Sequence, residues 1–152
     1  MRILTFSLAL LCSVSAQACP SILIADGEAA RENIARERKI ASDLSETADH
    51  VFVGRVAELQ SLGNEKTRAR FEVLELLKGQ SADQIEATAS PPQSLGCRKS
   101  DWFTVVPNLS MGATYVVYVA AGNVLRGASI YKERSASQLP IEEEKSIARV
   151  GT

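Results

Sequence analysis

The chain has little of what enzyme active sites are usually built from. Its 152 residues include one histidine, three cysteines and only 5% aromatic residues. A single histidine, His50, excludes a zinc-binding histidine cluster and leaves no convincing serine–histidine–aspartate set. The scattered glycines form no phosphate-binding loop, and the aspartates are not spaced as in a calcium loop. These absences predict a protein that is not an enzyme and that uses no cofactor.

Strong charge of one sign is missing as well. The chain carries 17 basic and 18 acidic residues, a formal net charge of −1. Single-stranded nucleic acids are bound by basic grooves interleaved with stacking aromatic side chains, so this composition argues against nucleic-acid binding. The single long apolar run, over residues 3–14, is too short to span a bilayer comfortably. The sequence therefore predicts no membrane span.

The N-terminal residues have the layout of a secretory signal. Met1-Arg2 gives a positive start before the apolar run, and Ala16 and Ala18 put small residues at the −3 and −1 positions of a cut after Ala18. We expect residues 1–18 to be removed and residues 19–152 to form a single domain that is secreted or periplasmic.

The cysteines carry the main ambiguity of the sequence. Cys12 leaves with the signal, so Cys19 and Cys97 remain as an even pair in an oxidising compartment, which favours a disulfide. A bridge between Cys19 and Cys97 would close a long loop, and the chain-entropy model predicts that it adds about 4–5 kcal/mol to the free energy of unfolding. Two other interpretations of Cys19 stay open: it is acylated as in a bacterial lipoprotein, after the weak lipobox Ala16-Gln17-Ala18, or it is an exposed N-terminal metal ligand.

Residues 28–45 are predicted to form a helix. Apolar side chains recur on one side of it, at Ala30, Ile34, Ala41 and Leu44, with no proline or internal glycine between them. The opposite face is expected to be a solvated charged surface. It comprises Arg31, Glu32, Arg36, Glu37, Arg38 and Lys39.

Strand-forming residues dominate the rest of the chain. Five strands are predicted, over 51–59, 67–77, 84–88, 114–120 and 124–131, with a further short one over 102–106. Gly54 inside the first strand predicts a bulge or bend of the kind that barrels need. A final helix starts near Pro140. Because no helix separates the strands, the order favours a mainly β fold, a small barrel or sandwich with flanking helices, over a parallel α/β fold.

The order of four short motifs resembles one known family. They are ADHVFVGRV at 48–56, RFEVLELLKG at 70–79, LGC at 95–97 and GATYVVYV at 112–119. Together with a cysteine at the mature N-terminus, this order is similar to the netrin-like domains, in particular the N-terminal domain of the tissue inhibitors of metalloproteinases and their bacterial relatives. The resemblance implies a five-stranded OB-fold-like Greek-key barrel over 48–131 with helices packed against it. On either side of the barrel, the residue pattern predicts an N-terminal extension with a helix over 19–47 and a C-terminal helix over 137–150.

The resemblance also implies a binding surface. In the inhibitors, the α-amino group and carbonyl oxygen of the first mature residue, a cysteine, chelate the zinc of the target protease, and its sulfur is bonded to a cysteine in a central loop. Carried over, Cys19 is the zinc-chelating residue, Cys97 is its disulfide partner, and Ser21 replaces a second family cysteine. The contact ridge consists of Cys19, Pro20, Ser21, Ile22, Leu23, Ser94, Leu95, Gly96 and Cys97.

The sequence thus supports a secreted, non-enzymatic domain that binds a protein partner, with a zinc metalloprotease as the sharpest expectation. Two alternatives remain. The first is a structural or interaction module of the cell envelope without inhibitory activity. The second is a lipoprotein held in the envelope by an acylated Cys19, whose sulfur and amine are then both blocked.

Overall fold

The computed structural model describes residues 27–90, 109–130 and 138–150. Within these ranges a helix precedes the five strands and a second helix follows them. The elements are α1 (Gly27–Thr47), β1 (His50–Gly63), β2 (Lys66–Lys78), β3 (Gln84–Ala89), β4 (Thr114–Ala120), β5 (Asn123–Ser129) and α2 (Ile141–Val150).

The five strands close into a barrel in the order β1-β2-β3-β5-β4. Neighbours are antiparallel except β3 and β5, which run parallel and meet at the pair Thr88 and Asn123. β1 closes the barrel, because it pairs with β2 along one edge and with β4 along the other. Its register shifts between Val53 and Gly54, where a Cβ on the glycine would lie 2.6 Å from the ring of Phe52. The predicted bulge and the five-stranded OB-fold-like Greek-key barrel are both confirmed.

Apolar side chains form two separate layers. One fills the barrel interior, where the rings of Phe52 and Phe71 meet edge to face with centroids 5.6 Å apart. The other lies between the outside of the barrel and the helices, and it includes Val51, Tyr118 and Ala148. Val51 and Phe52 contribute to different layers because successive strand residues point to opposite faces.

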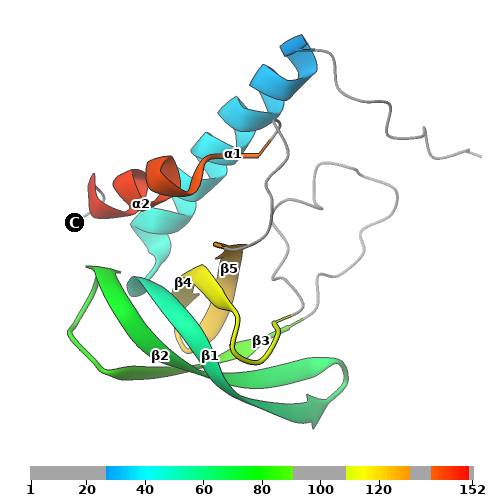
Figure 1. The fold of residues 1–152 in the computed structure, drawn as a ribbon, viewed down its shortest axis with the longest axis vertical. Coiled ribbons are helices and arrows are strands. Elements are labelled where there is room, and N and C mark those ends of the chain that lie inside the picture. Colours follow the sequence, from blue (N-terminus) through cyan, green and yellow to red (C-terminus); the bar gives the residue numbers. More distant parts are fainter. Residues whose placement is uncertain (1–26, 91–108, 131–137, 151–152) are drawn as a thin grey trace, which may run out of the picture.

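Both helices lie on the same side of the barrel (Figure 1). α1 packs more closely on α2 than on any strand. Its buried residues, Glu37, Ala41 and Ser45, are one turn apart, so they form one face of its second half. No side chain from Gly27 to Arg36 is buried, and the first turns of α1 extend past α2 in Figure 1. The helix is therefore embedded at its C-terminal end.

The elements fall close to their predicted positions, and one prediction about a helix face is wrong. Glu37 does not lie on a solvated face: its side chain is only 5% exposed, because it faces a cationic partner from β5. The short strand predicted over 102–106 lies outside the described residues. No helix among the described residues is long and apolar enough to cross a bilayer.

Candidate functional site

The predicted contact ridge, Cys19 to Leu23 and Ser94 to Cys97, lies outside the described residues. The structure does describe the elements next to both segments. The first segment precedes α1, and the second follows β3, which ends at Ala89. The contacts that hold α1 on the barrel therefore fix the point at which the chain from the first segment enters the helix.

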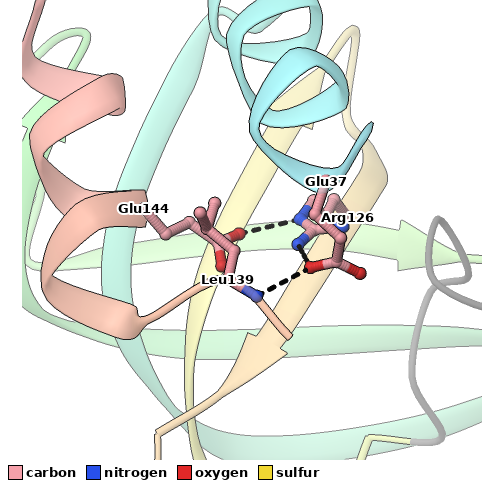
Figure 2. A network of polar contacts seen from close by, with 4 residues as sticks. All are labelled: Glu37, Arg126, Leu139 and Glu144. Atoms are coloured by element: carbon pink, nitrogen blue, oxygen red, sulfur yellow. Dashed lines mark hydrogen bonds and ion pairs between the residues drawn. The ribbon is translucent and has the colours of Figure 1, made fainter. Parts of the chain in front are cut away.

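A buried ion network holds α1 (Figure 2). Arg126 of β5 donates from Nη2 to Glu37 Oε2 of α1 at 3.1 Å and from Nε to Glu144 Oε1 of α2 at 2.7 Å. The backbone amide of Leu139, just before α2, donates to the same Glu37 oxygen at 3.4 Å. All three charged side chains are at most 5% exposed. One arginine thus connects both helices to the barrel.

The charges of this network stabilise one another. Burial alone would lower the pKa of the Arg126 guanidinium, but attraction and hydrogen bonds from Glu144 and Glu37 outweigh it and raise that pKa. Arg126 is therefore a permanent cation, and each carboxylate depends on it, because an unpaired buried charge is costly.

Two further contacts fix the C-terminal half of α1. Arg38 Nε donates to Glu143 Oε1 of α2 at 2.6 Å. Lys78, the last residue of β2, donates from Nζ to the backbone carbonyl of Ser45 at 2.6 Å. α1 has no basic residue in its own last turn, so Lys78 supplies the cation that the negative end of the helix dipole favours.

The motif residues at 48–50 and 78–79 have structural roles. The carboxylate of Asp49 accepts from the backbone amide of Ala121 at 2.7 Å and so orders the turn between β4 and β5. Gly79 has φ +105, and a Cβ there would lie 2.6 Å from the Asp49 carbonyl oxygen and 2.7 Å from His50 Cδ2. Lys78 therefore caps the C-terminal end of α1, and Gly79 leaves room for Asp49 and His50 at the start of β1.

The motif at 112–119 also serves the fold. Gly112 has φ +73 and donates its amide to the Val56 carbonyl at 2.9 Å, which joins this turn to β1. The hydroxyl of Tyr115 accepts from the amide of Ser110 at 3.1 Å. Tyr118 is fully buried beneath the helices. These described residues of the motifs thus serve the turns and packing of the barrel.

Hollows on the described surface include the following two. The larger, of about 290 Å³, lies between the C-terminal halves of α1 and α2 and is lined by Ser42, Ser45, Glu46, Ser146, Ile147 and Val150. The smaller, of about 70 Å³, lies on the outer face of β1, β2 and β3, and it is lined by Glu58, Gln60, Arg68, Arg70 and Glu86. The larger is at the lower limit of the volumes of pockets that bind drug-sized ligands, and the smaller is well below it.

No metal-binding cluster is found in the part of the chain that the structure describes. Over residues 27–90, 109–130 and 138–150, no three His, Cys, Asp or Glu side chains are placed to hold a metal ion. His50 packs beside Gly79 at the start of β1. The buried ion network and the Lys78 contact fix the helices on the barrel.

Sequence reasoning missed Arg126 and the role of Glu37, although two signals for them exist. Burial alternates along β5, where Val124, Arg126 and Ala128 are buried, so a period-two pattern would have placed the arginine with apolar residues. The apolar stripe of α1 skips one turn between Ile34 and Ala41, where Glu37 lies. A charge in the gap of an apolar stripe indicates a buried partner.

Comparison with known proteins adds no relative. No protein-family model matches the chain, and neither does any curated protein. The class that the fold itself defines is a mainly β chain with a closed five-stranded barrel and a helix at each end.

Proposed function

We propose that this chain is a secreted, non-enzymatic domain of the netrin-like type that binds a protein partner. In its sharpest form the proposal is inhibition of a zinc metalloprotease, with the α-amino group and carbonyl oxygen of Cys19 as ligands to the zinc of the target. The binding surface is the ridge formed by residues 19–23 and 94–97.

The barrel is the observation that carries the proposal. A closed five-stranded barrel with packed helices supports the proposal, because the netrin-like resemblance implies an OB-type barrel with helices against it. Motif residues such as Asp49, Lys78 and Gly112 have defined roles in that architecture. Because a fold can host many functions, the barrel supports the class more strongly than the target.

Chain lengths on both sides of the ridge agree with a Cys19–Cys97 bridge. Cys19 lies eight residues before Gly27, the first residue of α1, and Cys97 lies eight residues after Ala89, the last residue of β3. Each of these eight-residue segments reaches at most about 29 Å. Together they exceed the diameter of about 30 Å of a small domain, so chain length permits the bridge from these two anchors.

The physics of the proposed contact is that of a pre-ordered ligand. A disulfide at Cys19 fixes an otherwise free terminus, which reduces the entropy lost on binding. A zinc ion binds the neutral amine and displaces its proton. Acylation of the same amine would remove both the ligand and the charge.

The test is an inhibition assay with mature protein that starts at Cys19, against a panel of zinc metalloproteases. We expect inhibition of at least one protease and its loss when a single alanine precedes Cys19, because the amine then moves away from the zinc. The matched control carries the alanine after Thr152. Equal potency of the N-terminal extension would reject chelation by Cys19.

Intact mass of the exported protein separates the alternatives. The proposal predicts a chain cut after Ala18 that is two hydrogen masses lighter before reduction than after it. A mass increased by acyl chains would establish the lipoprotein instead. A disulfide-bonded chain that inhibits no protease on the panel would leave the envelope interaction module as the function.

A further inference from the structure

The two helices share one residue of the barrel as a binding partner. Glu37 of α1 and Glu144 of α2 bind different nitrogens of the same Arg126 guanidinium, at 3.1 and 2.7 Å (Figure 2). Glu37 also accepts from the amide of Leu139, which precedes α2 and is itself fully buried. Movement of either helix therefore disturbs the hydrogen bonds of the other.

α1 makes more of its contacts with α2 than with any strand of the barrel. Arg38 of α1 also pairs with Glu143 of α2 at 2.6 Å. Arg126 and Lys78 make polar contacts from the barrel to α1. α2 has its own attachment to the barrel through buried Ala148 and the Lys145–Glu75 pair at 2.8 Å. α2 is thus the intermediate layer through which α1 is held.

We propose that α1 and α2 form one latch, which detaches from the barrel and returns to it as a unit with Arg126 as the connecting residue. The side chains from Gly27 to Arg36, in the amino-terminal turns of α1, are not buried. The position of these turns then depends on α2, which lies at the other end of the chain. An event that loosens the ten-residue α2 loosens α1 in the same step. The consequence for ligand binding rests on the proposed function, whereas the latch itself does not.

Hydrogen exchange of the full mature chain tests the latch without any partner. In Glu144→Gln, which keeps the side-chain shape but removes its charge, we expect amides of Glu37–Thr47 and of α2 to exchange faster by the same factor, at least about tenfold. Amides of β1 and β4 keep their rates. The matched control is Glu142→Gln on the same helix. The Glu142 side chain is 82% exposed and its carboxylate lies 3.6 Å from Lys145 Nζ, a long and solvated ion pair. This variant should leave the exchange rates of both helices unchanged.

A second measurement covers the case in which Glu144→Gln does not fold. In the natural protein at low denaturant, amides of α1 and α2 should open with one common free energy and one common denaturant dependence, below those of the barrel strands. Faster exchange in α2 with unchanged exchange in α1 would overturn the latch. So would opening of both helices only together with the whole barrel. Because no protease enters these measurements, their outcome is independent of the inhibition assay.

Discussion

Arg126 is a residue whose removal leaves charge behind. Its guanidinium is enclosed with the carboxylates of Glu37 and Glu144, and all three side chains are at most 5% exposed. Replacing a whole buried ion network by apolar residues is often neutral, but removing a single partner strands the others in a medium of low dielectric. The network is therefore sensitive to single substitutions in a way that the surface ion pairs are not.

Substitution Arg126→Met should lower the free energy of unfolding by about 3–5 kcal/mol, because two carboxylates lose their cation. Urea unfolding followed by circular dichroism measures this. Lys39→Met is the control: its partner is Asp43 at 2.7 Å, both side chains are more than half exposed, and the expected loss is below about 1 kcal/mol. A loss of similar size in both variants would show that the network contributes no more than a surface pair.

Gly79 is constrained by conformation and by space together. With φ +105 and a backbone oxygen 2.6 Å from the position of a Cβ, Gly79→Ala should cost about 1–3 kcal/mol of folding free energy and raise the thermal sensitivity of the junction with β1. Gly27→Ala is the matched control, because nothing lies within 4 Å of its Cβ position and its φ is ordinary. The control should be neutral or slightly stabilising. Thermal unfolding of both variants decides the point.

At the scale of elements, most of the fold could be predicted because periodicity reports local burial. The alternation of Ala69 and Phe71 with Arg68 and Arg70 identifies β2 without knowledge of its neighbours. The pairing of β3 with β5 could not be found this way, because one parallel contact at Thr88 depends on closure of the whole sheet. Long-range contacts of this kind leave no periodic signal in either segment.

The site was less predictable than the fold for the same reason. Glu37 carries a charge in a helix rich in charges, and only the arginine from a strand far along the chain makes its burial favourable. The sequence contains both partners, but nothing local pairs them. A binding ridge assembled from distant loops likewise leaves no local signal that pairs its parts. The proposed ridge of residues 19–23 and 94–97 therefore rests on the resemblance.

The contact between α2 and β2 should depend on pH. Hydrogen bonds from Lys145 and, to a lesser degree, Arg149 lower the pKa of Glu75, while partial burial opposes them. A carboxyl with a lowered folded-state pKa stabilises the fold above its unfolded pKa of about 4.3, and this contribution is lost as pH falls through the folded value. The stabilisation is therefore complete at neutral pH and absent in strong acid.

Variant Glu75→Gln isolates this contribution. We expect its thermal midpoint to lie below that of the natural protein at pH 7 and to approach it as the pH falls below about 4. The matched control is Glu58→Gln, which removes the exposed partner of Arg70 on the same sheet, away from α2. A difference between Glu75→Gln and the natural protein that stays constant from pH 7 to pH 3 would contradict the assignment.

At the scale of the whole molecule, the predicted Cys19–Cys97 bridge would connect the segment before α1 to the chain after β3. The latch and the bridge would then act at opposite ends of α1: Arg126 holds its second half, and the disulfide limits the excursion of the residues before it. A covalent link of this length lowers the entropy of the unfolded chain more than it changes the folded state. Its effect should therefore appear in global unfolding.

Substitution Cys97→Ser should lower the free energy of unfolding of the exported protein by about 4–5 kcal/mol, and reductant should have the same effect on the natural protein but none on the variant. Cys12→Ser is the matched control, because a signal cut after Ala18 removes that position from the mature chain. Urea midpoints with and without reductant, together with thiol alkylation and intact mass, provide the measurement. Two alkylatable thiols in the untreated protein, or a midpoint indifferent to reductant, would show that Cys19 is not bonded to Cys97.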